Sequence, residues 1–410
     1  MSSLTESLVN KVAENCIDLY CRLPKTGKPN EKEWTVLSCF LIYNKKTDDI
    51  EVVSLGTGSK SIGSSKLSPN GDIMNDSHAE VFARRGFLIY LYDNIEKALK
   101  LESSIFVKVG NKFQLKDNIE LIFYSSQLPC GDASIISKNE AVVNCGEVLQ
   151  KKRKLMHDET EIDPKKQKVS EDIHRTGAKC LPHSTQDLKL PGAGFHILGQ
   201  VRTKPGRGEP TLSVSCSDKI ARWIHTGVHG ALLDILCDPI YIKYFVFGGG
   251  VPYSTDSLHR AFLGRNPDYS DKIQIVPEFY QSSIQFPYIK ADKRANATPG
   301  SILWVKLRNP ILEVAILGKK LGVTKKKSNL LSSSLCISKH NLYKRFLGVL
   351  LKIEELKESV IGAEDVASIP YNVMKKKSEN YVSKWLMVKD NFFKTWTTKP
   401  DFWNFCVDLT

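Results

Sequence analysis

The chain has 410 residues, 41% of them hydrophobic and 25% charged, with a formal net charge of +13 and a pI near 9.1. Hydrophobic residues spread along the whole chain, which excludes extended disorder, and no apolar run is long enough to cross a membrane. The excess of lysine and arginine favours a polyanionic partner such as nucleic acid.

Cysteine usage and the N-terminus indicate where the protein resides. Ten cysteines are scattered without the paired spacing of a secreted disulfide scaffold. The first twenty residues form an amphipathic pattern that lacks the apolar core of a signal peptide. We therefore expect a soluble protein inside the cell, in the nucleus, the cytoplasm or both.

The first hundred residues predict a helix, a β-hairpin and a second, long helix. The hairpin comprises 34–44 and 50–60, which are rich in β-branched and aromatic residues. Its end, GTGSK at 56–60, lacks the Gly-Lys-Ser/Thr ending of a phosphate-binding loop, so we interpret it as a loop near the substrate, with a plain turn as the alternative. Residues 75–100 carry apolar positions at helical spacing, which predicts the long helix.

Asn75-Asp76-Ser77-His78-Ala79-Glu80 places a metal ligand and a proton carrier two residues apart at the start of this long helix. His78 is the candidate ligand and Glu80 the candidate proton carrier. Ser77 and Glu80 also fit a capping box, in which each side chain satisfies a backbone amide of the other residue. That purely structural role is the alternative for Glu80.

A second strand-and-helix unit repeats this placement. The strand at 118–126 is followed by Pro129-Cys130, which we expect to open a helix. The charged stretch at 151–175 is nearly free of large apolar residues and predicts a mobile insertion. Its basic clusters, 151–154 and 165–168, fit either a nuclear signal or a solvated charge run.

After the insertion, a Gly- and Pro-containing loop at 201–213 leads through a short strand to Cys216, which is expected to begin a helix. Further strands are predicted at 240–247, 301–307 and 312–317, and helices at 338–356 and 379–393. The sequence contains no internal repeat and no linker. We therefore predict one α/β domain over residues 1–410: a mixed sheet with helices on its faces and an added C-terminal helical layer.

The candidate residues suit a zinc centre that activates water. Catalytic zinc usually takes three protein ligands and leaves one position for water, whose pKa falls from about 15.7 to about 7. The deaminase pattern H-x-E followed by P-C-x-x-C supplies such ligands, with the glutamate moving the proton. Here Ala133 stands where the second cysteine belongs. Spacing leaves three candidates for the second thiolate, of which only the last follows a predicted strand and precedes a helix: Cys145, Cys180 and Cys216.

NDSHAE, LPCGDAS and SCSDKIARW resemble, in order and wording, the adenosine deaminases that act on RNA. RLPKTGKPNEKEWTVLS is similar to the start of the deaminase domain in the tRNA-type branch. The resemblance covers nearly the whole chain and implies a cytidine-deaminase-like fold, with His78, Cys130 and Cys216 as zinc ligands and Glu80 as the catalytic residue. It also implies hydrolytic conversion of adenosine to inosine, typically just 3′ of the tRNA anticodon. No obligatory protein partner is evident from the sequence.

The same resemblance implies two further groups of residues. Those placed near the RNA are Ser59, Lys60, Lys204 and Glu209, while Arg202 and Arg207 fit phosphate contact equally well. Basic residues in stretches that look interior need an anion or solvent, because a buried cation without a partner is costly. The family encloses inositol hexakisphosphate, and the matching positions are Asn75, Arg84, Arg85, Lys219, Arg222, Trp223, Lys339, Tyr371, Lys375, Tyr381, Trp396 and Lys399.

The implied pocket departs from the family pattern at Ala231, in place of a serine, and at Thr398, in place of an acid. Asp76 and Lys219 are expected to link the zinc centre to the anion through hydrogen bonds. Two other functions use much of the same sequence: a cytidine-to-uridine RNA deaminase, which shares the metal and the glutamate, and a catalytically silent RNA-binding relative.

Overall fold

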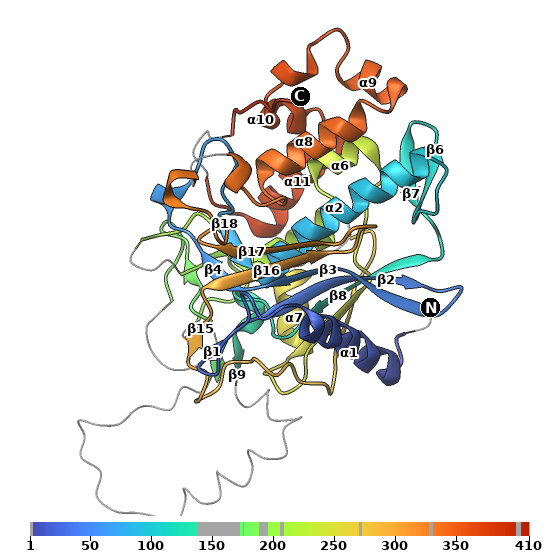
Figure 1. Ribbon diagram of the computed structural model, residues 1–410. Helices are drawn as coiled ribbons and strands as arrows, with labels where there is room; N and C mark the ends of the chain where they lie inside the picture. Colours follow the sequence, from blue (N-terminus) through green and yellow to red (C-terminus); the bar gives the residue numbers. More distant parts are fainter. Residues whose placement is uncertain are drawn as a thin grey trace, which may run out of the picture.

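The computed structural model in Figure 1 describes residues 3–137, 173–174, 176–187, 196–205, 209–269, 273–327, 331–398 and 403–409. Apart from residues 173 and 174, the predicted insertion at 151–175 lies outside the described residues, as do Cys145, Arg207 and Lys399. Within the described ranges, no helix is long and apolar enough to span a membrane.

An eight-stranded mixed sheet forms the centre of the fold, in the order β14-β13-β8-β2-β3-β16-β17-β18. The predicted hairpin is confirmed, because β2 and β3 pair antiparallel. Only the pairs β8–β13 and β13–β14 are parallel among the sheet's pairings. The bounds are β2 Leu37–Asn44, β3 Asp49–Thr57, β8 Ile119–Ser125, β13 Tyr244–Phe247, β14 Glu278–Gln281, β16 Gly300–Val305, β17 Ile311–Ile316 and β18 Lys319–Lys320.

Both faces of this sheet are covered by helices, since alternate side chains of a strand point to opposite faces. Cys39 and Leu41 of β2 pack in a cluster with α1 (Glu6–Arg22). Phe40 and Ile42 pack on the other side with α2 (Ala79–Leu99). Figure 1 shows α1 below the sheet and α2 above it. The predicted α/β layering, a mixed sheet flanked by helices, is confirmed.

The start of the long helix differs from the prediction. Asp76–His78 is the short strand β5, which pairs with β4 (Ser59–Ser61), and α2 begins only at Ala79. His78 occupies the N-cap position without a side-chain cap hydrogen bond. The capping box of Ser77 and Glu80 is therefore wrong, because pairing with β4 holds Ser77 in extended backbone.

Cys130 does not open an α-helix. It precedes a single 3-10 turn at Asp132–Ser134, and the chain then enters the short strand β9 (Ile136–Ser137). The prediction for Cys216 is confirmed, because it is the first residue of α5 (Cys216–Thr226), whose N-cap Ser215 accepts a hydrogen bond from the amide of Asp218.

A helical layer covers α2 on the side away from the sheet, at the top of Figure 1. The predicted helix at 338–356 is two helices, because the chain turns at 351–353. The layer comprises α6 Ala231–Leu236, α8 Lys339–Leu350, α9 Glu354–Val360, α10 Tyr371–Lys376 and α11 Glu379–Val388. The predicted C-terminal helical layer is thus confirmed.

The remaining elements are short. Helix α7 (Thr255–Phe262) buries Leu258 and Phe262 against the same cluster as α2. Two-stranded ribbons comprise β1 (Glu33–Trp34) with β15 (Asn296–Ala297), β6 (Phe106–Val109) with β7 (Lys112–Leu115), β9 with β10 (Ile173–His174), and β11 (Lys179–Cys180) with β12 (Arg202–Thr203).

Candidate metal centre and anion cavity

Three of the predicted ligands meet at the ends of β5, β8 and α5. The imidazole of His78 is hydrogen-bonded to the side chain of Cys130, and the amide of Cys216 donates to Cys130 Sγ at 3.3 Å. Among the described residues, no three such side chains stand around a common centre as in a formed metal site. They contact one another directly instead. One imidazole and two thiols are nevertheless a donor set that suits zinc.

Ser217 connects the segments of Cys130 and Cys216 through two hydrogen bonds. Its amide donates to the carbonyl of Cys130 at 3.0 Å, and its hydroxyl donates to the carbonyl of Pro129 at 3.1 Å. Gly131 allows this approach because it has φ of 110°, a region that other residues rarely adopt, and a Cβ there would overlap Ser215 Oγ. The local sequence PCG therefore positions its thiol against α5.

The alternative thiol that the structure describes is engaged elsewhere. Cys180 is buried in the ribbon of β11 and β12, where its sulfur accepts hydrogen bonds from Gln200 at 3.0 Å and from Arg202 at 3.4 Å. Of Cys180 and Cys216, only Cys216 contacts Cys130. The choice suggested by spacing thus agrees with the geometry of the described residues.

Asp76 is the charged centre around which the site is built. Its carboxylate is 5% exposed and accepts from His78 Nδ1 at 2.8 Å, from Lys204 Nζ at 2.9 Å and from Lys219 Nζ. Because Nδ1 is taken by Asp76, Nε2 is the ring nitrogen left to contact Cys130. Hydrogen bonds connect His78, Asp76 and Lys219, and the further link to an anion stays a prediction.

Lys204, which the resemblance places near RNA, is buried at the candidate centre, and its contact with the nucleotide stays a prediction. It is 1% exposed, and besides Asp76 its ammonium contacts Cys216 Sγ at 3.0 Å. Burial raises the pKa of Cys216, and the charge of Lys204 opposes that rise. Sequence reasoning could not detect this contact, because the loop around Lys204 is rich in Gly and Pro and looks exposed.

The charges of this cluster shift the pKa values of Asp76, His78 and Cys130 so that each side chain favours its ionised form. Burial opposes the ionised form of Asp76, but Lys204, Lys219 and His78 outweigh it and hold the pKa of the carboxyl well below its usual range. Burial and Lys204 oppose protonation of His78, yet Asp76 raises the pKa of its ring to about 9. The hydrogen bond from Cys216 lowers the pKa of the Cys130 thiol. The site therefore favours one anionic sulfur.

Glu80 lies in the first turn of α2, two residues after His78. The residue is 3% exposed, and its Oε2 has no hydrogen-bond partner among the described residues. Burial raises the pKa of its carboxyl. A buried carboxyl with a free oxygen is a candidate group for carrying a proton.

The residues implied to lie near RNA occupy two neighbouring loops. Ser59 and Lys60 belong to β4, and the carbonyl of Lys60 lies 3.2 Å from His78 Nδ1. Glu209 accepts hydrogen bonds from Ser64 Oγ at 2.9 Å and Ser65 Oγ at 2.8 Å, which joins the two loops. Ser59, Lys60 and Glu209 are thus grouped beside the candidate centre.

Arg202 is not available for phosphate contact. Its side chain is 2% exposed and pairs with Asp187 through two hydrogen bonds, Nη1 at 2.6 Å and Nη2 at 2.9 Å. It therefore holds the segment around Asp187 against β12. From the sequence alone Arg202 looks exposed, because its acidic partner Asp187 lies fifteen positions earlier.

A cavity of about 260 Å³ lies next to the candidate centre, between α2, α5 and the helical layer. Its walls contain six cations and one carboxylate, Asp76. Of the twelve positions implied by the resemblance, eleven line it: Asn75, Arg84, Arg85, Lys219, Arg222, Trp223, Lys339, Tyr371, Lys375, Tyr381 and Trp396. The twelfth, Lys399, lies outside the described residues.

The cavity leaves cationic groups unsatisfied, which fits an enclosed anion. Arg85 Nη2 and Arg222 Nε are buried without a hydrogen-bond partner among the described residues. The guanidinium of Arg222 stacks over Trp385, 3.6 Å from the ring centroid. Burial raises the pKa of the Tyr381 hydroxyl, but Arg222 and Arg84 outweigh this and lower it. Buried cations of this kind are costly without a counter-ion, so the lining favours a bound anion.

Two residues outside the expected set also bear on the cavity. His229 lines it, and its Nε2 lies 3.1 Å from Asp234 Oδ1. Ala231, the position that departs from the family pattern, is part of the wall as well, whereas Thr398 lines a neighbouring cavity. The histidine could not be found from sequence, because its Val-His-Gly context carries no charge pattern.

Comparison with known proteins agrees with this geometry. The adenosine-deaminase (editase) domain matches residues 54–400, and the chain therefore belongs to the adenosine-deaminase (editase) family. It is 36% identical to tRNA-specific adenosine deaminase 1 of Drosophila melanogaster, over 96% of this chain and 95% of that protein. It is 32% identical to the Homo sapiens protein of the same name, over 95% and 98%. The Saccharomyces cerevisiae protein of that name is 28% identical over 66% of each chain.

Asp76→Asn should destabilise the protein by about 3–5 kcal/mol, because Lys204 and Lys219 would then remain as buried cations without their carboxylate. The free energy of unfolding, measured by urea titration, checks this. Asp390→Asn is the control, since that side chain is 65% exposed and pairs only with Lys389 at the surface. A loss below about 1 kcal/mol for Asp76→Asn, typical of an unremarkable site, would contradict the central role of this carboxylate.

Proposed function

We propose that this protein is a zinc-dependent tRNA adenosine deaminase that converts adenosine to inosine by hydrolysis. The observation that carries the proposal is the meeting of His78, Cys130 and Cys216 beside the buried carboxyl of Glu80, in a chain of the editase family. The relatives named tRNA-specific adenosine deaminase 1 support tRNA as the substrate. The whole chain, residues 1–410, acts as one deaminase domain in this proposal.

His78, Cys130 and Cys216 would hold the zinc ion, which supplies a water of low pKa as the nucleophile. Asp76 fixes the tautomer of His78 through Nδ1, and Lys204 donates a hydrogen bond to the sulfur of Cys216. The carboxyl of Glu80 would carry one proton of the attacking water to the purine ring nitrogen and its other proton to the departing amine. The reaction consumes one water and releases inosine and ammonia.

The target adenosine must leave the base stack to reach a buried carboxyl. In an anticodon loop this step is cheap, because the base is already unpaired. We therefore place the target just 3′ of the anticodon, with Ser59, Lys60 and Glu209 beside the flipped nucleotide. The two loops that carry these residues are joined by the hydrogen bonds of Glu209, so they present one surface.

The cavity lined by Arg84, Arg85 and Arg222 supports an enclosed inositol hexakisphosphate as a structural cofactor. A polyanion there would satisfy the free guanidinium groups and pair with Lys219, which already contacts Asp76. The anion would then stabilise the same carboxylate that orients His78. All nine described cysteines are unpaired, which fits a reducing intracellular compartment, the nucleus or the cytoplasm.

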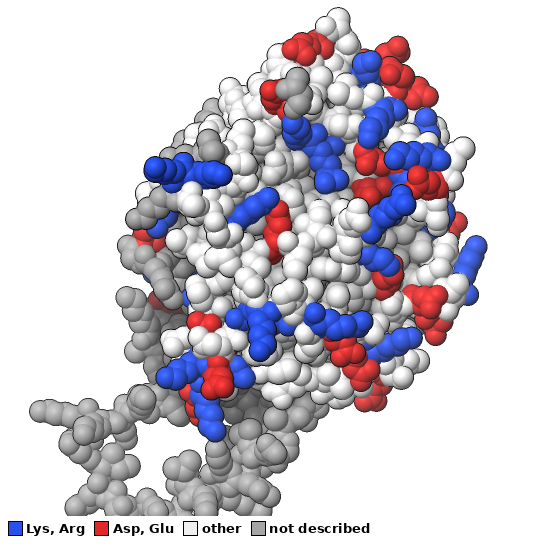
Figure 2. Space-filling model, in the orientation of Figure 1, with Lys and Arg blue, Asp and Glu red and all other residues white. Residues whose placement is uncertain are grey.

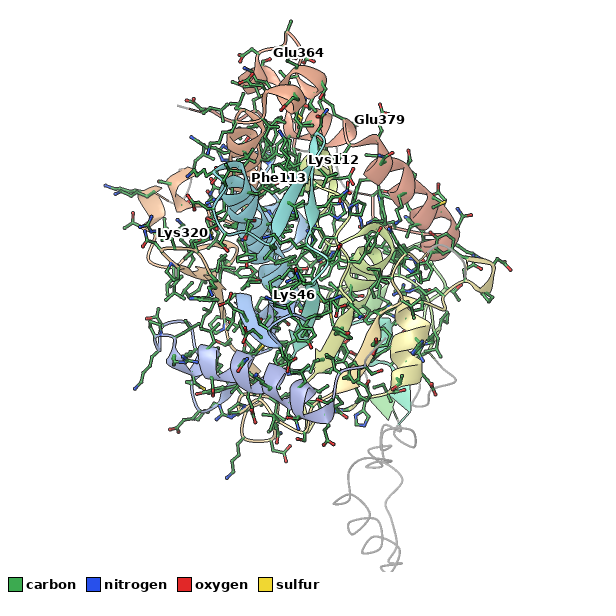
Figure 3. The ribbon with its side chains drawn as sticks, turned by 90° about the vertical axis from the view of Figure 1, so that its right-hand side faces the viewer. Lys46, Lys112, Phe113, Lys320, Glu364 and Glu379 are labelled. Carbon is green, nitrogen blue, oxygen red and sulfur yellow. The ribbon has the colours of Figure 1, made fainter. Side chains whose placement is uncertain are left out.

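Glu80→Gln should retain about one zinc per chain and a native unfolding transition but form inosine at least about a hundredfold more slowly, because the amide cannot carry the proton. Inosine is mapped by sequencing total tRNA after incubation with the purified protein, where it reads as guanosine. Glu379→Gln is the matched control, an exposed carboxyl at the start of α11 that Figure 3 labels at the surface.

The same sequencing separates the alternatives. New uridines at cytidine positions would identify a cytidine deaminase, and a protein that binds tRNA without zinc or any product would be a silent relative. Undiminished inosine formation by Glu80→Gln would show that another group moves the proton.

Lys375→Gln should weaken retention of inositol hexakisphosphate, because Lys375 lines the cavity. Lys376→Gln, one residue along α10, should not, since that side chain is exposed. Phosphorus per chain after acid extraction of purified protein measures the difference, and the melting temperature should fall with it. Fully active, stable wild-type protein that contains no organic phosphate would contradict the cofactor.

A further inference from the structure

A lysine-rich segment lies apart from both the metal centre and the cavity. Residues 319–327 contain five lysines and no acid. The first two form β18, the edge strand of the large sheet, and the last three form a 3-10 turn. We name Lys319, Lys320, Lys326 and Lys327 the lysine edge. Basic side chains are prominent at the upper left margin of Figure 2, where Figure 1 places β18 and the segment after it.

The lysine edge is connected by a hydrogen bond to the segment that precedes β5. The amide of Met74 donates to the carbonyl of Gly318 at 3.0 Å, and the amide of Leu321 donates to Val314 at 2.7 Å. Gly318 has φ of 80°, and a Cβ there would overlap the carbonyl oxygen of Met74. The β17–β18 turn therefore lies directly on the residues before β5, and Lys319 and Lys320 follow this turn.

Met74 connects the lysine edge to the candidate centre along the chain. It precedes His78 by four residues, of which Asp76–His78 form β5. Figure 1 shows β4 and β18 on the same side of the molecule. Because β4 pairs with β5 at His78, this side also carries the candidate centre. Lys66, which is exposed, belongs to the 3-10 turn Ser64–Lys66, whose Ser64 contacts Glu209.

Protection of the sheet edge accounts for only part of this charge. Lysines on an edge strand prevent pairing with another chain, which explains Lys319 and Lys320, and Lys320 also pairs with Glu313 at 2.8 Å. Lys326 and Lys327 lie beyond the strand, and both are exposed. Within the described part of the chain, no carboxylate lies within ion-pair distance of Lys326 or Lys327. Their positive charge is therefore available to a binding partner outside the molecule.

We propose that the lysine edge binds the phosphate backbone of the substrate tRNA outside the target adenosine, on the side of the molecule that carries the candidate centre. The proposal rests on the proposed function for the identity of the RNA. Exposed lysines contact phosphates, and such contacts set register rather than sequence preference. The lysines here belong to a paired strand and a 3-10 turn, so they do not form the extended free segment that peptide-binding partners recognise.

The test is the salt dependence of tRNA binding by the double variant Lys326→Gln/Lys327→Gln. Loss of two phosphate contacts should reduce the slope of log Kd against log salt by about 1.4–1.8 and weaken binding roughly tenfold near physiological salt. The inosine-forming kcat at saturating tRNA should be unchanged, because neither lysine contacts the candidate centre. A short anticodon stem-loop RNA should show the same loss as whole tRNA.

Two matched variants complete the experiment. Lys46→Gln/Lys100→Gln removes the same charge from exposed positions at the far ends of β3 and α2, and should bind like wild type. In Figure 3 Lys46 lies on the face turned to the viewer and Lys320 at the margin. Lys326→Arg/Lys327→Arg should restore the wild-type slope, since arginine also contacts phosphate.

An unchanged slope in Lys326→Gln/Lys327→Gln would overturn the proposal, as would an equal loss in the control variant. Wild-type tRNA binding combined with lost binding to a purified nuclear import receptor would overturn it in favour of a protein partner. The slope comes from a binding measurement, so it can be determined even if the wild-type protein forms no inosine. A lack of inosine would reject the proposed function without deciding whether the lysine edge binds tRNA.

Discussion

The structure depends on one buried carboxylate, that of Asp76, and on the three cationic groups that converge on it. Lys204, Lys219 and His78 come from three separate parts of the chain, and each would be costly to bury alone. Together they hold β5, the loop before α5 and the first turns of α5 at one point. The geometry of the candidate metal centre follows, because His78 can present Nε2 to the thiols only while Asp76 holds Nδ1.

The same carboxylate joins the two functional regions. On one side it reaches the thiols through His78 and Lys204, and on the other it reaches the cavity through Lys219. An anion bound among the cavity's arginines would pair with Lys219 and thereby act on the network that orients the metal ligands. The candidate metal centre and the cavity are thus joined by ordinary ion pairs over a few residues. The coupling requires burial, since exposed pairs of this kind contribute little.

Several parts of this arrangement could be predicted from the sequence. His78, Glu80 and Cys130 were identified from residue types and spacing, and the hairpin from its β-branched strands, because these signals are local. Local rules failed where tertiary contacts dominate. Ser77 was expected to cap α2 but pairs with β4, and Cys130 was expected to open a helix but precedes a single 3-10 turn. In both places pairing or packing with a distant segment outweighs the intrinsic preference of the residue.

The sequence by itself determined the family, the chemistry of the donor set and eleven residues that line the anion cavity, because side-chain types and motif order survive without coordinates. Only the tertiary structure decided what each basic residue faces. Lys204 and Arg202 stand in a loop that looks exposed, yet both are buried on carboxylates distant in sequence, whereas Lys326 and Lys327 are exposed. The sequence shows which side chains are charged, but the electrostatic free energy of each charge depends on burial and on partners that only folding brings together.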